Sequence, residues 1–492
     1  MRRAVRHVVV VGGGTAGSVL AARLSATPTV SVTLIEAGPD DDAYDAGILD
    51  PALAADAWTG SGPVVSTPMA SPAGPIPMPQ GRLLGGTSAV NGLATLRGLP
   101  HDYDSWEASG LPGWGWADVV DTFMAAERDL DFGPSPIHGD SGPLPVRRWR
   151  RHELSRAQRA YYDGMVEIGE PRVRDVNDPS QLPGIGVFPV TIDHDGRRVS
   201  TSLAYLTPAV RARENLTIRT GVEVASVIID GRRATGVRLT SGAFIEADEI
   251  IVSAGAIWSP TLLLRSGVGP ADHLAEHGIA VHADLPVGAT MSDHLGPVMP
   301  YRHDGPRGGI AGPAQVVLIG ASDGSTVDYH AFPIAPAPGG ADTVFQMAVF
   351  LMRSSGAGSV RLGDGPGSDP RVTAPPLPSD AVDRLRHAFG RLAAWERSVA
   401  ARELGCEPVT PLDLSAPDAV PTALERLTLS YCHMTGTVPM GRVLDADCRV
   451  VGIDGLRVVD ASSMPAIPTG NTYLGCVMVA ERVARKMAAE ST

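Results

Sequence analysis

A histidine and an asparagine near the C-terminus are of the types that can transfer a proton at an oxygen atom and orient that oxygen. His433 begins the run His-Met-Thr-Gly-Thr, and Asn471 follows within Pro-Thr-Gly-Asn-Thr. An imidazole can accept a hydroxyl proton near neutral pH. An amide can hydrogen-bond the same oxygen and stabilise developing negative charge, but it is not a base. The chain has 13 histidines, so on its own His433 would be interpreted as structural.

Three glycines near the N-terminus, in the pattern Gly-x-Gly-x-x-Gly, could hold a diphosphate. They follow the apolar run 8–11, predicted as a buried strand, and precede a helix predicted over Ser18–Ala26. Such a turn presents backbone N–H groups and a helix N-terminus to phosphates. Glu36 ends the next predicted strand, where a carboxylate can bind ribose hydroxyls and disfavours a 2′-phosphate. The segment predicts an FAD or NAD site that includes Gly12, Gly14, Thr15, Ala16, Gly17 and Glu36.

A second run dense in small residues spans 81–92. Small side chains let the backbone pass close to a flat ligand, and the Asn91 amide could bind the polar edge of that ligand. Alone, this run would equally describe a glycine-rich turn. The candidate ligand-binding residues of the run are Arg82, Gly85, Gly86, Asn91 and Gly92.

The elements that would position these residues alternate between strands and helices. A small β meander is predicted over 215–253, a long helix over Ala381–Ala401 and a closing helix over about 475–488. The stretch Gly38–Gly81 is rich in proline and glycine, so we predict an irregular cover over another part of the molecule. The opening order of strand, glycine turn, helix and strand predicts an α/β fold of the Rossmann type.

The composition excludes several classes of protein. Hydrophobic residues make up 43% and charged residues 19% of the chain, as in a soluble globular protein. A net charge of −13 argues against nucleic acid as a partner, and no apolar run is long enough to be a transmembrane segment. The four cysteines have neither disulfide nor metal spacing. Since the N-terminus lacks an export core, we expect a cytoplasmic protein.

Two charged features are interpreted as parts of the surface. The run Arg147–Arg151 is predicted to be a solvated face. His273 and His277 stand four apart on a predicted helix, a spacing that could ligate a metal. With no third ligand evident, we predict an exposed helix and no metal site.

Two long segments carry a family resemblance. Arg82–Asn91 and Gly255–Pro270 resemble, in order, the two signatures of the glucose-methanol-choline (GMC) oxidoreductases. The run at His433 resembles the family's His-x-x-Gly-Thr motif, and Asn471 occupies the position of its second active-site residue. The resemblance, which runs essentially end to end, implies that His433 is the base and Asn471 its partner. Val90 stands where some members bond a histidine covalently to flavin, so non-covalent FAD is implied.

The resemblance also assigns residues to parts of the FAD. Val224 would hold the adenine through its backbone. Asp460 and Ala461 would hold the ribityl–diphosphate part. Asn471 and Thr472 would lie near the pyrimidine end of the flavin ring.

The resemblance further implies two domains. A Rossmann-like FAD-binding domain would be discontinuous, formed by 1–155, 195–295 and 428–492. A substrate-binding domain with a mixed sheet and helices, of the α+β kind, would be formed by 156–194 and 296–427.

The chain departs from the family pattern in two places. The linker 285–294 is one residue shorter than the family's loop and lacks its usual asparagine. The predicted substrate domain is also short. A smaller domain implies either a more open pocket or a pocket completed by a partner subunit in a homo-oligomer.

The implied reaction is oxidation of a primary or secondary alcohol to an aldehyde or ketone by hydride transfer to flavin. Hydroxymethylfurfural-type oxidases look similar around 82–98, and mycofactocin-associated dehydrogenases look similar in length. The electron acceptor could therefore be oxygen, or a quinone or other redox carrier. A lyase or decarboxylase on the same fold is the alternative of another class.

Overall fold

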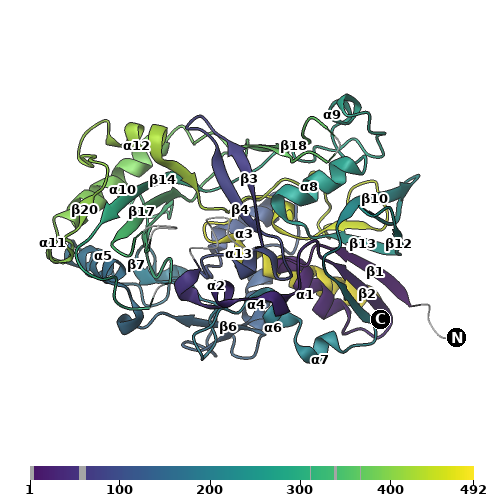
Figure 1. Cartoon of the computed structure of the whole chain (residues 1–492), viewed down its shortest axis with the longest axis horizontal. Helices are drawn as coiled ribbons and strands as arrows, with labels where there is room; N and C mark the ends of the chain where they lie inside the picture. The colour runs from purple at the N-terminus through teal and green to yellow at the C-terminus, as the bar shows by residue number, and fades with distance from the viewer. Residues whose placement is uncertain (1–4, 55–62, 311, 337–340, 366, 492) are drawn as a thin grey trace.

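A five-stranded parallel sheet carries the predicted nucleotide-binding turn (Figure 1). Its order is β22-β13-β1-β2-β9, and all neighbouring pairs are parallel. Its strands are β1 (Arg6–Val11), β2 (Val30–Ile35), β9 (Leu216–Arg219), β13 (Glu249–Val252) and β22 (Leu456–Val458). The predicted α/β class is thereby confirmed. The structure is a computed structural model and describes residues 5–54, 63–310, 312–336, 341–365 and 367–491.

Helices follow two of these strands at the same edge of the sheet. α1 (Thr15–Leu24) follows β1, and α8 (Gly255–Arg265) follows β13. Because the strands are parallel, both helices begin beside their carboxyl ends, where open α/β sheets bind ligands. The closing helix α13 (Thr472–Ser491) packs along α1, and both chain termini lie beside this sheet (Figure 1).

The predicted meander is present, but its strands differ from the prediction at its start. β10 (Val224–Asp230), β11 (Arg233–Leu239) and β12 (Phe244–Glu246) form an antiparallel sheet. The run 216–218, which was predicted to open the meander, instead lies in β9 at the edge of the parallel sheet, beside β2.

An antiparallel seven-stranded sheet forms the opposite half of the molecule (Figure 1). α5 (Arg156–Glu167), α10 (Ala381–Glu396) and α12 (Ala419–Leu427) pack against it. The sheet has the order β20-β14-β17-β16-β15-β7, with β21 also paired to β14. Its strands are β7 (Gly184–Val187), β14 (Leu295–Arg302), β15 (Val316–Gly320), β16 (Tyr329–Ile334), β17 (Val344–Leu351), β20 (Glu407–Pro408) and β21 (Thr428–Ser430).

The single helix predicted over Ala381–Ala401 is wrong. The chain forms α10 and then a second helix, α11 (Val399–Leu404). Ser398 has an extended backbone between them, and its hydroxyl accepts a hydrogen bond from the N–H of Ala401 at 3.1 Å. The serine therefore caps α11 and ends the helical periodicity of α10.

The cover predicted over Gly38–Gly81 is more regular than its composition indicated. β3 (Val64–Ala70) and β4 (Ile76–Gly81) pair as an antiparallel hairpin. The hairpin joins β18 (Ser359–Arg361) and β19 (Arg371–Thr373) in a four-stranded sheet that lies between the two halves of the molecule (Figure 1). Short helical turns precede it, including α2 (Ala46–Leu49), and residues 55–62 lie outside the described residues.

The remaining elements include a small sheet, β5-β6-β8, and several helices that connect the larger sheets. These elements are α3 (Pro100–Ala108), α4 (Trp116–Ala126), β5 (Glu127–Asp129), β6 (Leu144–Arg148), β8 (Pro189–Val190), α6 (Thr201–Tyr205) and α7 (Pro208–Arg211). Several of these connecting elements, among them α4, α6, α7 and β6, lie below the β3–β4 hairpin in Figure 1.

The run Arg147–Arg151 is only partly a solvated face, which corrects the prediction. Arg148 is buried and forms ion pairs with Asp129 and Asp175. The same cluster contains His138, which lies 2.7 Å from Asp175 and 2.9 Å from Glu127. A buried arginine needs such partners, because an unpaired buried charge is very costly.

The buried charges around His138 predict a loss of stability at alkaline pH. Burial lowers the pKa of His138, but hydrogen bonds to Asp129, Asp175 and Glu127 outweigh this and raise the pKa to about 10. The folded chain therefore holds this proton more tightly than the unfolded chain. The contribution of protonated His138 to the stability of the folded chain is complete below about pH 6.5 and is lost as the pH rises towards 10.

We expect His138→Gln to be destabilised by about 3–5 kcal/mol at neutral pH. Between pH 7 and 10, the free energy of unfolding of this variant should fall by less than that of the unchanged protein. Urea midpoints at both pH values measure this, and exposed His194 supplies the matched control, His194→Gln. The same alkaline loss in all three proteins would contradict the assignment.

His273 is not on an exposed face, which corrects a further prediction. It is 4% exposed, and its Nε2 accepts a hydrogen bond from the N–H of Leu362 at 3.1 Å. Both ring nitrogens of His277 lie 3.0 Å from backbone carbonyls. Glu276 lies 3.5 Å from His273. The contacts of the two histidine rings with Leu362 and Gly363 fasten α9 (Ala271–Glu276) to the chain after β18.

Among the described residues, no helix is long and apolar enough to cross a membrane.

Candidate active site

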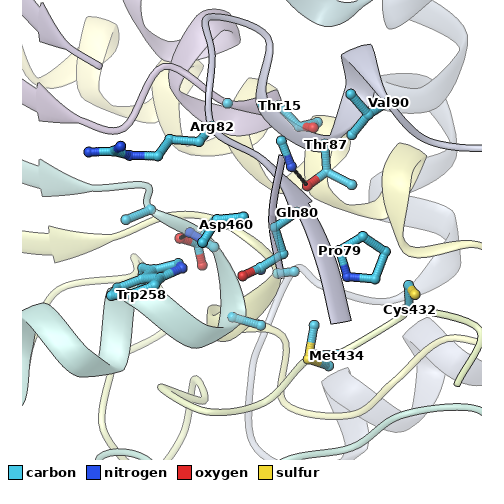
Figure 2. Close-up of a pocket in the computed structure, with 18 of the residues that line it drawn as sticks. Thr15, Pro79, Gln80, Arg82, Thr87, Val90, Trp258, Cys432, Met434 and Asp460 are labelled. Atoms are coloured by element: carbon cyan, nitrogen blue, oxygen red, sulfur yellow. Dashed lines mark hydrogen bonds between the residues drawn. The ribbon is translucent and has the colours of Figure 1, made fainter. Parts of the chain in front are cut away.

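A cavity of about 990 Å³ runs from the turn after β1 to the seven-stranded sheet. This volume is at the upper end of the range for ligand pockets. Figure 2 shows Gln80 and Pro79 of β4 in its middle, with Arg82 on one side and Cys432 and Met434 on another. The hairpin therefore forms a wall shared by the two halves of the molecule.

Most of the predicted site residues line this cavity. They are Gly12, Gly14, Thr15, Ala16, Glu36, Arg82, Gly86, Asn91, Gly92, Val224, His433, Asp460, Ala461, Asn471 and Thr472. Gly17 and Gly85 are not among the lining residues. A Cβ on Gly17 would stand 1.8 Å from the Gly12 oxygen, so this glycine lets α1 pack against the turn. Gly85 has a φ of +91°, and a Cβ there would stand 2.3 Å from the Tyr44 hydroxyl oxygen.

The start of α1 offers free backbone donors to the cavity. Its N-cap residue, Gly14, has no side chain to occupy them, so the first N–H groups are available to an anion. Glu36 is held beside them by the N–H groups of Gly13 and Gly38, each at 2.8 Å. Burial raises the pKa of Glu36, and these two hydrogen bonds oppose the rise. This donor and acceptor set fits a diphosphate followed by a ribose.

Asn91 is oriented by an arginine that the sequence analysis missed. Arg198 donates to Asn91 Oδ1 at 2.8 Å, and the N–H of Leu93 donates to the same oxygen at 3.0 Å. The amide nitrogen of Asn91 is thereby left for a ligand in the cavity. Arg198 is fully buried, and this burial lowers its pKa to about 10.

Asp460 fastens the end of the β22 segment to the start of α8. Its carboxylate accepts hydrogen bonds from the N–H groups of Gly255 and Ser462, each at 2.8 Å. The hydroxyls of Ser462 and Ser259 also donate to it. Burial raises the pKa of Asp460, and these donors oppose the rise. Ser259 lies inside the segment 255–270, and the sequence of that segment did not indicate its contact with Asp460.

His433 and Asn471 meet at the cavity. His433 Nε2 lies 3.1 Å from Asn471 Nδ2, and each residue is 7% exposed. Because the amide nitrogen can only donate, His433 Nε2 accepts and carries a lone pair. The proton of the neutral ring is then on Nδ1. Asn471 Oδ1 is buried and has no hydrogen-bond partner among the described residues.

A second histidine, His294, stabilises this tautomer and was missed by the sequence analysis. The Nδ1 atoms of His294 and His433 lie 3.0 Å apart, so the Nδ1–H of His433 can donate to His294. Asp293 holds the two segments together, because it accepts hydrogen bonds from the backbone N–H groups of both histidines. Asp293 and His294 are the last two residues of the linker 285–294. The departure of this linker from the family pattern was the only sign in the sequence that it contributes to the site.

Burial keeps this histidine cluster uncharged. It lowers the pKa of His433 to about 3, with a smaller effect from His330, whose own pKa burial also lowers to about 3. Burial lowers the pKa of His294 as well, reinforced by His433. His433 Nε2 is therefore unprotonated throughout the neutral pH range.

An aromatic stack shields His433 from the side of the seven-stranded sheet. The ring of Tyr431 lies 4.0 Å from that of His433 and stacks on Phe350 at 4.6 Å with an angle of 15°. Phe332 lies 5.2 Å from Tyr431 on the same side. These rings pack together on the sheet side of His433.

The cavity fits a large cofactor with both anionic and flat parts. Free helix N–H groups, Glu36 and the Asn91 amide all line it. Gln80 Oε1 is buried and has no hydrogen-bond partner among the described residues, so it offers an acceptor to a ligand in the cavity. Val90 lines the cavity (Figure 2) and, as an alkyl side chain, cannot form a bond to a flavin. The fold and the site define a dinucleotide-dependent oxidoreductase.

Comparison with known proteins identifies the family. Residues 7–296 and 354–480 match the two sequence profiles of the GMC oxidoreductases. A 5-(hydroxymethyl)furfural oxidase from Methylovorus sp. (strain MP688) is 37% identical, over 97% of each chain. An oxygen-dependent choline dehydrogenase from Burkholderia mallei is 33% identical, over 97% of this chain and 93% of the relative. The chain belongs to the GMC oxidoreductase family and is an FAD-dependent enzyme acting on CH–OH groups.

A solved structure supports the same assignment. Pyridoxine 4-oxidase from Mesorbium loti superimposes with a TM-score of 0.87 at 30% identity, covering 98% of this chain and 99% of the other. The two family matches leave out 297–353, the segment with most of the seven-stranded sheet. Family membership therefore says least about the wall formed by this sheet.

Proposed function

We propose that the enzyme oxidises a primary or secondary alcohol to the aldehyde or ketone with non-covalent FAD and with His433 as the base. The observation that carries the proposal is the buried pair of His433 Nε2 and Asn471 Nδ2, 3.1 Å apart at the cavity. An alcohol oxygen placed against both atoms would lose its proton to Nε2 and keep a hydrogen bond from the amide.

The surrounding residues support this proton transfer. His294 Nδ1 accepts from His433 Nδ1–H, so the ring gains its second proton at Nε2 without turning. His433 is buried beside Tyr431, and burial strengthens the hydrogen bonds to the alcohol oxygen. FAD, when bound, supplies the acceptor for the hydride that leaves the alcohol carbon.

The relatives suggest the first compounds to test. 5-(Hydroxymethyl)furfural and pyridoxine are added anaerobically to the purified holoenzyme, and the flavin's visible absorbance is followed. Bleaching supports alcohol oxidation, whereas turnover without bleaching would indicate a lyase or decarboxylase. Reoxidation of the bleached enzyme by oxygen and by a quinone then distinguishes an oxidase from a dehydrogenase that uses a redox carrier.

A further inference from the structure

One face of the seven-stranded sheet forms the wall of the cavity beside His433. Side chains alternate between the two faces of a strand, and the lining residues follow this period. On the three central strands they are Val298 of β14, Phe332 and Ile334 of β16, and Gln346 and Phe350 of β17. Leu429 and Ser430 of β21 also line the cavity, and the Ser430 hydroxyl donates to Asp293. Ile334 is the cross-strand partner of Gln346. Ala348, which lies between Gln346 and Phe350 on β17, is the cross-strand partner of Phe332.

This wall has no formal charge. The charged residues that line the cavity all lie outside the seven-stranded sheet: Glu36, Arg82, Glu223, Arg265, Asp369 and Asp460. His330, which pairs with Phe350, is neutral because burial lowers its pKa to about 3. Within the part of the chain that the structure describes, a charged substrate group beside this wall would meet no counter-charge.

Among the described lining residues of β14, β16 and β17, only Gln346 has a polar side chain. It is half-buried and lines the cavity, and its side-chain amide has no hydrogen-bond partner among the described residues. It lies four residues along β17 from Phe350, which corresponds to about 13 Å. An amide that faces a cavity among apolar neighbours gains its hydrogen bonds from a ligand.

We infer that the substrate is an uncharged, elongated alcohol with a hydrogen-bonding group at the end remote from the reacting carbon. Its hydroxyl lies at His433, its flat apolar body lies against Phe332 and Phe350, and its remote polar group binds Gln346. The inference rests on the proposed function and adds the class of substrate. It excludes alcohols with a cationic or anionic remote end.

Four para-substituted benzyl alcohols of equal length test this inference. A three-carbon chain carries a carboxamide, an isosteric branched alkyl group, a trimethylammonium or a carboxylate. For the holoenzyme, we expect kcat/KM for the amide to be about ten-fold higher than for the alkyl compound, as one hydrogen bond provides. The ammonium and carboxylate compounds should be about 100-fold poorer than the amide.

Substitutions at Gln346 assign the preference to this residue. Gln346→Met should abolish the preference for the amide over the alkyl compound by lowering kcat/KM for the amide about ten-fold. Gln346→Glu should make the ammonium compound better than the carboxylate. Gln181 does not line the cavity, so Gln181→Met is the matched control and should keep the amide preference. Bound FAD and the thermal midpoint of each variant show that it is folded.

The outcomes separate the inference from the proposed function. Bleaching by all four compounds with similar kcat/KM would overturn the inference and leave alcohol oxidation intact. A preference of the unchanged enzyme for the ammonium compound would overturn it too, because the aromatic rings would then bind a cation. If no alcohol, including those of the earlier test, bleaches the flavin, the proposed function fails and the inference with it.

Discussion

Replacing His433 by alanine should lower the rate of anaerobic flavin reduction by an alcohol about 10²–10⁴-fold, the usual contribution of a general base. The reason is that His433 Nε2 is the basic atom of the buried pair, and Asn471 cannot accept a proton in its place. Stopped-flow absorbance of the FAD-loaded enzyme measures the rate directly.

Cofactor content distinguishes this loss from unfolding. FAD should stay bound to His433→Ala, because the glycine turn, Glu36 and Asn91 lie along other parts of the cavity. His303 is also buried but is not among the lining residues, so His303→Ala is a matched control that should reduce normally. If His433→Ala bound FAD fully and its flavin were reduced at an unchanged rate, His433 would not be the base.

The nucleotide-binding turn could be predicted because its constraints are local. The glycine spacing, the preceding strand and the following acid all lie within one strand–helix–strand unit, and the structure places the turn at the carboxyl end of β1. Gly17 shows how direct this is, because its missing Cβ leaves room for the Gly12 carbonyl.

The hairpin between the two halves could not be predicted from composition. Pro77 and Pro79 made the stretch look irregular, yet both lie in β4, the edge strand of its sheet. An edge strand tolerates proline because one side of it needs no backbone donor. Whether this proline-containing stretch forms a strand therefore depends on its position at the edge of the sheet, and the spacing of residues in the sequence does not give that position.

The partners of the proposed catalytic pair depend on contacts distant in sequence. His294 and His433 are 139 positions apart, and Arg198 and Asn91 are 107 apart. No periodicity joins such residues, and each becomes meaningful only when the fold brings it to a cavity. The predicted domain boundaries likewise depend on long-range packing and stay a prediction.

Replacing Asn471 should show that its donor, and not its size, sets the state of the base. In Asn471→Ala the alcohol oxygen loses one hydrogen-bond donor, so flavin reduction should slow about 10²–10³-fold. In the isosteric Asn471→Asp, a carboxylate would face His433 Nε2. It would accept a hydrogen bond from that nitrogen and raise the pKa of His433. The base would then be protonated before the alcohol arrives.

Asn471→Asp should therefore be slower than Asn471→Ala, by about another ten-fold or more, although it keeps the shape of the side chain. The two variants are compared by anaerobic stopped-flow reduction with the same alcohol at saturating concentration. Their FAD content should be equal if the change acts on the proton and not on the cofactor. If the aspartate variant were as fast as the alanine variant, the lone pair on Nε2 would not be the feature that Asn471 preserves. The order of the two rates thus tests the tautomer, which the loss of activity on removing His433 cannot do.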